Sequence, residues 1–284
     1  MKVDRAFLAI PGSKWQLARI LVKLLPPHRT YVEVFGGGAN LLFRKPLSEV
    51  EVYNDIDGNL VNLFRVVRDE EKFRKFARKV YWTLYSREEF HYAVNRENSR
   101  DIDDIERAWC TWISTTQGYG GRKAWPTWSY AINKGQIESW HDLNEKLEIF
   151  HQRLRNVQIE NLDFRDIIPR YDTAETLFYL DPPYYPKTRE AIIYVFEFSK
   201  KDYDDLFNIL LKVKGKVMLS GYYHPAFDVL ENAGWKRLDF KVRTSCPNAN
   251  AVDKEIARAE RIESVWLNYE PPTQINYLDF EEEE

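Results

Sequence analysis

Short apolar runs alternate with amphipathic segments along most of the chain, and this order predicts an α/β fold. Short segments that read as strands stand at 31–35, 50–53, 157–160, 176–180, 216–220, 235–240 and 262–268. Apolar residues at helical spacing predict helices at 13–25, 39–44, 59–80 and 201–212. A strand, a glycine turn, a helix and a second strand open the chain in that order, which is typical of a doubly wound sheet.

The pattern changes between residues 65 and 156, where charged helical segments replace buried strands. A stretch rich in glycine and tryptophan, residues 118–135, predicts a hairpin or an irregular loop inside this region. We therefore expect one sheet domain built from residues 1–64 and 157–270, interrupted by a mainly helical insertion at 65–156. Residues 271–284 are expected to form an acidic C-terminal tail.

Composition and charge narrow the class of protein. The 284 residues are 44% hydrophobic and carry a net charge of −3. Six acids and no Lys or Arg lie from Glu270 onward, so the part before them carries +3, and a nucleic-acid partner is not excluded. No apolar run approaches the roughly 20 residues of a membrane span, and no signal-peptide pattern opens the chain. Two cysteines and five scattered histidines predict neither a disulfide scaffold nor a metal site. These observations favour a cytoplasmic protein without a membrane partner.

The first candidate site is a glycine turn at the end of the first predicted strand. Phe35 precedes Gly36, Gly37 and Gly38, and glycines at such a turn let a ligand approach the backbone. Asp55 ends the next strand, where a carboxylate can accept hydrogen bonds from both hydroxyls of a ribose. Together they indicate a cofactor that contains adenosine. Leu41 stands where the third glycine of a dinucleotide fingerprint would be, which favours S-adenosylmethionine, a cofactor without phosphate.

The second candidate site is the tetrapeptide Asp181-Pro182-Pro183-Tyr184, directly after the apolar run 176–180. A carboxylate at the C-terminal end of a parallel strand points into the crevice where α/β sheets bind ligands. The Asp181 carboxylate and the Pro182 carbonyl then offer two acceptors to one planar amino group, and Tyr184 offers a ring face for stacking. Two acceptors on its hydrogens localise the lone pair of an aromatic amine, so a methyl group can be transferred directly to the nitrogen.

The runs YVEVFGGGANLLF, YNDID and YLDPPYY together resemble the Dam-like family of DNA adenine N6-methyltransferases. The resemblance covers nearly the whole chain, with a target-recognition segment between the glycine motif and the catalytic motif. It implies a Rossmann-like sheet, S-adenosylmethionine as cofactor, and an adenine flipped out of the duplex. It also implies that Lys14 contacts the cofactor, and that Asp163 and Phe164 lie near the cofactor adenine.

DNA recognition is expected in the insertion. Residues 65–100 hold ten Lys or Arg against six acids, but a solvated helix face explains most of these charges. Residues 118–134 are the sharper candidate for DNA contact. In this stretch and directly before it, Gln117, Arg122 and Lys123 are expected to reach base edges or phosphates, and Trp125 is expected to wedge or pack. This stretch does not match the hairpin of family members that read GATC, so the target sequence stays open.

Other readings stay open as well. The same tetrapeptide suits cytosine N4 in DNA or adenine N6 in RNA as the methyl acceptor. A nicotinamide-dependent dehydrogenase is disfavoured by the incomplete glycine fingerprint, and a non-catalytic DNA-binding protein by the intact Asp55, Asp181 and Tyr184. The leading prediction is a monomeric, site-specific adenine methyltransferase acting on double-stranded DNA, with a cognate restriction endonuclease as a candidate partner.

Overall fold

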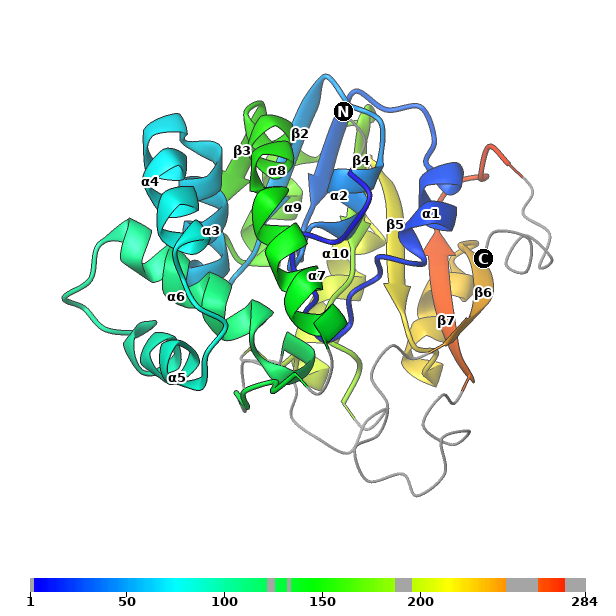
Figure 1. Ribbon diagram of the computed structural model, residues 1–284. Helices are drawn as coiled ribbons and strands as arrows, with labels where there is room; N and C mark the ends of the chain where they lie inside the picture. The colour runs from blue at the N-terminus through cyan, green and yellow to red at the C-terminus, as the bar shows by residue number, and fades with distance from the viewer. Residues whose placement is uncertain (1–2, 122–125, 132–133, 187–195, 244–259, 274–284) are drawn as a thin grey trace.

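Seven strands form one sheet in the computed structural model, which describes residues 3–121, 126–131, 134–186, 196–243 and 260–273 (Figure 1). They are β1 (Thr30–Glu33), β2 (Val50–Asn54), β3 (Val157–Glu160), β4 (Thr176–Leu180), β5 (Lys216–Gly221), β6 (Lys236–Arg243) and β7 (Glu260–Leu267). Their order across the sheet is β3-β2-β1-β4-β5-β7-β6. The pairings of β7 with β5 and β6 are antiparallel and the other pairings are parallel. All seven predicted strands are confirmed. The observed strand ends differ from the predicted ends by no more than three residues.

The order of the strands places the ligand crevice. The chain builds β1, β2 and β3 toward one edge and then returns to place β4 on the other side of β1. β1 and β4 are parallel neighbours, with Val32 opposite Phe178. The strand order therefore reverses between β1 and β4, and doubly wound sheets bind ligands outside the carboxyl ends of the strands at such a point. The glycine turn follows β1 and Asp181 follows β4, so both motifs meet there.

Buried side chains cover both faces of the sheet, which explains why the parallel strands read as continuous apolar runs. One face packs against α9 (Phe164–Tyr171), α10 (Lys200–Leu210) and α11 (Asp228–Asn232). The opposite face packs against α1 (Ala18–Leu21), α2 (Asn40–Arg44) and α3 (Gly58–Arg68). Ser199 begins α10 with a capping box that it shares with Asp202.

Two predicted helices differ from the structure. The predicted helix at 13–25 is a regular helix only at α1, followed by a 3₁₀ turn at Val22–Leu24, because several of its backbone bonds join residues three apart. The predicted helix at 59–80 is two helices, α3 and α4 (Glu70–Tyr81). Asp69 separates them, because its backbone is extended (φ −75°, ψ 125°) and its carboxylate accepts from the Lys72 N–H as an N-cap.

The described residues between 65 and 156 form helices that share their core with the sheet. The helices after α4 in this region are α5 (Arg87–Arg96), α6 (Asp104–Thr116), α7 (Lys134–Glu145) and α8 (Leu147–Leu154). The ring of Phe7 lies 5.3 Å from Trp112 of α6 and 4.8 Å from Phe150 of α8. The predicted boundary at 64/65 falls inside α3. A separate domain at 65–156 therefore stays a prediction, because one apolar cluster continues across its proposed borders.

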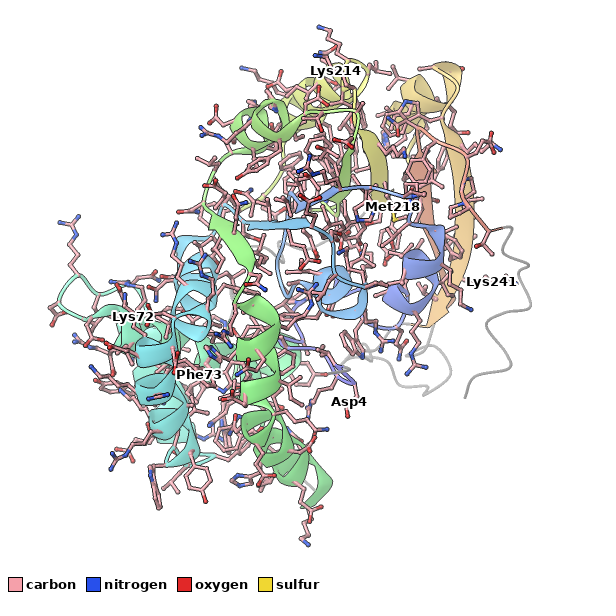
Figure 2. The ribbon with its side chains drawn as sticks, turned by 90° about the horizontal axis from the view of Figure 1, so that it is seen from above. Asp4, Lys72, Phe73, Lys214, Met218 and Lys241 are labelled. Atoms are coloured by element: carbon pink, nitrogen blue, oxygen red, sulfur yellow. The ribbon has the colours of Figure 1, made fainter. Side chains whose placement is uncertain are left out.

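The helices of the insertion gather at one end of the sheet. Figure 2 shows Lys72 and Phe73 of α4 at one end of the molecule and Lys241 of β6 at the other, with Met218 of β5 between them. No described helix is long and apolar enough to cross a membrane. The described residues also contain no cluster of His, Cys, Asp or Glu suited to a metal ion.

The stretch at 118–135 has the base of a hairpin in its described part. Gly118 and Trp128 form an antiparallel bridge. The Tyr119 N–H donates to the Thr127 carbonyl at 2.7 Å, and the Ser129 N–H donates to the Gln117 carbonyl at 2.9 Å. Arg122, Lys123 and Trp125, the residues predicted to contact DNA, lie outside the described residues, as does most of the acidic tail.

Candidate active site

A pocket opens at the carboxyl ends of β1 and β4, where the strand order predicts it. It combines the loop before α1, the turn after β1, the end of β2 and the residue after β4. Six of the predicted site residues line it together: Lys14, Phe35, Gly36, Gly38, Asp55 and Asp181.

The glycine turn is required by the packing of the protein itself. A Cβ atom at Gly36 would lie 2.2 Å from the Tyr53 ring, and one at Gly38 would lie 2.7 Å from the Leu8 carbonyl oxygen. Gly37 has a φ of +49°, a conformation that residues with a side chain rarely adopt. The turn therefore lets the backbone pass close to β2 and to the N-terminal segment, in addition to leaving room on its pocket side.

Asp55 is held beside this turn. One of its carboxylate oxygens accepts from the Gly37 N–H at 2.7 Å and the other from the Asp57 N–H at 2.8 Å. Burial raises the pKa of Asp55 to about 6, while these backbone donors act to lower it. The carboxyl group is thus fixed in direction, and each oxygen keeps a second lone pair for a ligand.

Glu33 also lines the pocket, and the analysis of motifs did not select it. It is the last residue of β1, and its Oε2 accepts from the Tyr31 hydroxyl at 3.0 Å and from the Leu42 N–H at 2.9 Å. Burial raises the pKa of Glu33 to about 8, against the effect of these two donors. The signal that marks it in the sequence is an acid inside the apolar run YVEVF.

The charged residues that line the described pocket are mostly acidic. Lys14 is the cation, and Glu33, Asp55, Asp57 and Asp181 are the carboxyl groups. Such a lining stabilises a cationic ligand with free hydroxyl groups and repels a pyrophosphate. The charged groups of the pocket therefore fit S-adenosylmethionine and do not fit a nicotinamide dinucleotide.

Lys14 and Ser220 converge on one oxygen of Asp181. The Lys14 ammonium lies 3.0 Å from Asp181 Oδ1 and donates to the Gly12 carbonyl at 3.1 Å. The Ser220 hydroxyl donates to the same Oδ1 at 3.0 Å. Burial lowers the pKa of Lys14, but the negative groups around it raise the pKa well above its ordinary value, so it stays an ammonium at neutral pH. Both lone pairs of Asp181 Oδ1 are thus used within the protein.

Tyr184 is placed differently from the prediction of an open stacking face. Its ring is buried and lies 4.2 Å from the ring of Tyr222 at 23°, so one face is covered by a stacked side chain. Its hydroxyl accepts from Lys14 at 3.0 Å and donates to Glu263 Oε1 at 3.0 Å. Pro182 is buried, and the Tyr203 hydroxyl donates to the Pro183 carbonyl at 2.7 Å, which holds the turn in place.

Asp163 and Phe164 lie behind the pocket and not in its lining. Asp163 caps α9 by accepting from the Arg165 N–H at 2.8 Å, and its carboxylate pairs with the Arg165 guanidinium at 3.2 Å. Phe164 is buried with its ring 6.0 Å from that of Phe35, which does line the pocket. In the structure, Phe164 thus supports a pocket residue, and the carboxylate of Asp163 is used within the protein.

Gln117 is buried, which corrects its selection as a residue that reads DNA. Its Nε2 donates to the Leu84 carbonyl at 2.9 Å, and its Oε1 accepts from the Ser86 N–H at 3.2 Å. Both ends of the amide therefore hold the connection between α4 and α5. Nearby, the Arg87 guanidinium lies 4.5 Å from the centre of the Trp128 ring at the base of the hairpin.

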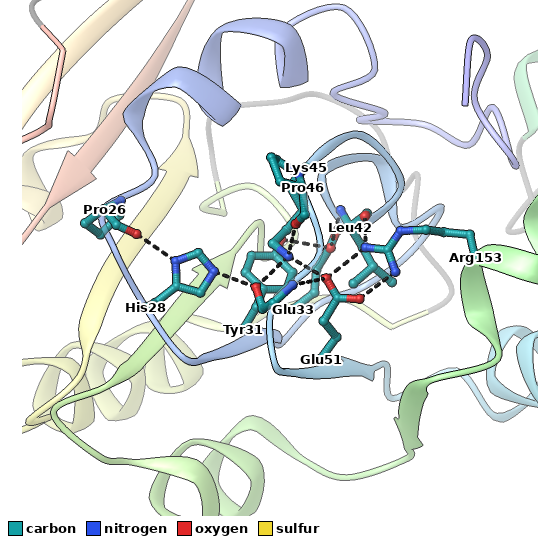
Figure 3. A network of polar contacts seen from close by, with 10 residues as sticks. Pro26, His28, Tyr31, Glu33, Leu42, Lys45, Pro46, Glu51 and Arg153 are labelled. Atoms are coloured by element: carbon teal, nitrogen blue, oxygen red, sulfur yellow. Dashed lines mark hydrogen bonds and ion pairs between the residues drawn. The ribbon is translucent and has the colours of Figure 1, made fainter. Parts of the chain in front are cut away.

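A buried polar network joins the pocket to the helical region (Figure 3). Arg153 of α8 donates to both oxygens of Glu51 on β2 and to the Leu42 carbonyl of α2. Lys45 donates to Glu51 as well. The Leu42 N–H in turn donates to Glu33, so a continuous set of bonds runs from α8 to the pocket.

Comparison with known proteins identifies the family of the chain. A family model described as D12 class N6 adenine-specific DNA methyltransferase matches residues 11–244. The DNA adenine methylase of Escherichia coli (strain K12) is 24% identical over 193 residues, which cover 67% of this chain and 69% of that protein. The type II methyltransferase M.MjaIII of Methanocaldococcus jannaschii is 26% identical over 259 residues, which cover 78% of this chain and 86% of that protein.

Among solved structures, a precorrin-6y C5,15-methyltransferase from Geobacter metallireducens covers 94% of this chain and 92% of its own, at 10% identity and a TM-score of 0.36. A likeness this weak does not bear on function. The family model, in contrast, spans most of the chain and includes the pocket, the glycine turn and Asp181. The chain belongs to the D12 class N6 adenine-specific DNA methyltransferase family.

Proposed function

We propose that the pocket between β1 and β4 binds S-adenosylmethionine, and that the chain transfers its methyl group to the N6 amino group of an adenine in double-stranded DNA. The observation that carries this proposal is the pocket itself, in which the glycine turn, Asp55 and Asp181 meet and carboxyl groups outnumber Lys14. Membership of a methyltransferase family implies this cofactor.

In this proposal, each buried acid serves a different part of the cofactor. S-adenosylmethionine supplies a methyl group that is already activated on a cationic sulfur. Asp55 accepts hydrogen bonds from the ribose hydroxyls, because its two oxygens are fixed by Gly37 and Asp57. Glu33 is proposed to accept a hydrogen bond from the positively charged amino group, because it is a buried acid that lines the same pocket as the glycine turn and Asp181.

Asp181 and the Pro182 carbonyl accept the two hydrogens of the adenine amino group. This contact orients the nitrogen lone pair, and Lys14 and Ser220 hold the carboxylate in position from its other oxygen. The adenine leaves the duplex to reach the site, which costs a few kcal/mol. We infer that the chain acts as a monomer, and a cognate restriction endonuclease stays a candidate partner beside a solitary role.

The direct test is transfer of tritium from labelled S-adenosylmethionine to unmethylated genomic DNA. We expect label in N6-methyladenine after digestion to nucleosides, and Asp181→Ala should abolish transfer while cofactor affinity changes by only a few-fold. Asp239→Asn is the matched control, because Asp239 pairs with Arg237 and Ser264 on the far edge of the sheet.

Three results would contradict the proposal. Near-normal turnover by Asp181→Ala would remove Asp181 from the site, and label in N4-methylcytosine would show the other planar amine that the same two acceptors suit. RNA as the preferred acceptor would likewise favour the alternative substrate.

A further inference from the structure

The last strand of the sheet carries a buried acid that the motifs do not include. Glu263 lies on β7 and is 4% exposed, whereas its neighbour Ile262 is 55% exposed. The side chains of a strand alternate between its two sides, and this alternation turns Glu263 toward the interior. There it meets Tyr184, 79 residues away in the sequence.

The hydrogen bonds around Glu263 run in one direction. The Lys14 ammonium donates to the Tyr184 hydroxyl at 3.0 Å, and this hydroxyl donates its only proton to Glu263 Oε1 at 3.0 Å. Lys14 also lies 3.6 Å from Glu263 Oε1 and 3.0 Å from Asp181 Oδ1. One ammonium therefore binds two carboxylates and the phenol between them, and it joins the loop before α1 to β7 and to the end of β4.

The second oxygen of Glu263 is unusual. Oε2 is buried and accepts no hydrogen bond from a described residue. Folded proteins rarely leave a buried carboxylate oxygen unsatisfied, because its desolvation is costly. Burial raises the pKa of Glu263, and Lys14 and the Tyr184 hydroxyl act against this rise. The protein thus keeps an acid here at a cost to stability, which indicates a role beyond packing.

We propose that Glu263 is a positioning residue for methyl transfer, which holds the Tyr184 hydroxyl and Lys14 so that Asp181 presents Oδ2 to the target amino group. Without an acidic acceptor on β7, the Tyr184 hydroxyl loses the acceptor of its proton, and Lys14 and the ring of Tyr222 are left as its neighbours. Lys14 then has Asp181 as its main counter-charge, and its full charge weakens that carboxylate as an acceptor. The inference rests on the proposed function.

The test is Glu263→Gln in the full chain, because glutamine keeps the shape and an acceptor oxygen but removes the charge. We expect the single-turnover rate of tritium transfer to fall on the order of tenfold to a hundredfold. The dissociation constant of S-adenosylmethionine, measured by calorimetry, should stay within twofold. Glu231→Gln is the matched control, because Glu231 also accepts from an aromatic side chain, that of Trp266, but pairs with Arg237 instead of Lys14. It should transfer at the wild-type rate.

A double-mutant cycle with Tyr184→Phe tests whether Glu263 acts through the hydroxyl. If it does, Glu263→Gln slows the Tyr184→Phe protein far less than it slows the wild type. Fully additive losses, a wild-type rate in Glu263→Gln, or a rate loss matched by lost cofactor binding or lost folded protein would each overturn the inference. Thermal unfolding of every variant supplies the folded fraction. If the wild-type protein itself transfers no label to adenine in DNA, the proposed function fails instead.

Discussion

Glu33 and Asp55 end neighbouring strands, and burial sets the protonation of both. The pKa of Asp55 is raised to about 6 and that of Glu33 to about 8. An acid with a raised pKa binds its proton more tightly in the folded chain than in the unfolded chain, so its contribution to stability falls as pH rises from its unfolded pKa to its folded pKa. Asp55 lowers the free energy of unfolding as pH rises to about 6, and Glu33 continues to lower it up to about pH 8.

Glu33→Gln should therefore flatten the pH dependence of stability between pH 6 and 8, because glutamine has no proton to lose. Each pKa unit that the variant removes corresponds to about 1.4 kcal/mol. Urea unfolding at pH 6, 7 and 8 measures this slope. Glu175→Gln, which changes an exposed acid, is the control and should keep the wild-type slope, whereas an unchanged slope in Glu33→Gln would contradict the assignment.

Asp55→Ala should chiefly weaken the binding of S-adenosylmethionine. A ribose that loses a charged acceptor in a buried site is expected to lose about 1.5–3 kcal/mol of binding free energy. Calorimetry with the cofactor measures this loss, and Asp57→Ala controls for the general charge at the end of β2. Equal affinity in the Asp55 variant and the wild type would show that the ribose lies elsewhere.

Single residues were predictable where a strand end places them. Asp55 and Asp181 each follow an apolar run, and the carboxyl ends of parallel strands share one edge of the sheet. Glu33 was not predicted because it lies inside an apolar run. In such a run, attention goes to the strand and not to a single acid within it. Glu263 escaped because its partners, Lys14 and Tyr184, are far from it in sequence, and only the pairing of β7 with β5 brings them together.

At the scale of elements, the central parallel strands β4 and β5 were predictable because burial on both faces favours near-continuous apolar runs. The helices were less so, since a single N-cap such as Asp69 divides one periodic pattern into α3 and α4. The hairpin was recognised from composition, and its base is confirmed by the bridge between Gly118 and Trp128. Composition does not reveal which polar side chains at that base form hydrogen bonds with the backbone. Gln117 is one of them.

The residues of the hairpin beyond its base still carry the prediction of DNA contact. Replacing Arg122 and Lys123 together by Ala should weaken DNA binding and lower its dependence on salt, because fewer phosphates are neutralised. If Arg122 contacts guanine, selectivity at one position should also relax by about 1–3 kcal/mol. Fluorescence anisotropy at several salt concentrations measures both effects, and cofactor affinity should not change.

Lys236→Ala is a suitable control for this pair, because Lys236 lies on β6 at the far edge of the sheet and pairs with Glu270. Equal DNA affinity and equal site preference in the double variant and the wild type would move the search to the basic helices at 65–100. Gln117→Ala should behave differently from the pair and lower the free energy of unfolding by about 1–3 kcal/mol, since it leaves buried backbone groups unsatisfied.

At the scale of the whole molecule, Arg153 ties the end of the insertion to β2 and α2. Arg153→Met should lower the free energy of unfolding by about 3–5 kcal/mol, because Glu51 is buried and would lose one of its two cations. Urea unfolding followed by tryptophan fluorescence measures the loss, with the exposed Arg155→Met as control. We expect a single transition in both variants, and separate unfolding of the helical region would contradict the continuous core.

The rings of Phe7, Trp112 and Phe150 pack against one another, so residues 65–156 share an interior with the N-terminal segment. This shared interior limits how new DNA specificities can be engineered. A chimaera that takes residues 65–156 from a relative would import one half of an interior and leave its complementary half behind, so mismatched aromatic volumes would unfold the recipient. Grafts restricted to the residues between the bridged Gly118 and Trp128 leave Phe7, Trp112 and Phe150 in place and so avoid this mismatch. When related proteins change the DNA sequence that they recognise, we therefore expect most substitutions between Gly118 and Trp128. The helices between residues 65 and 156 should change only together with the N-terminal segment.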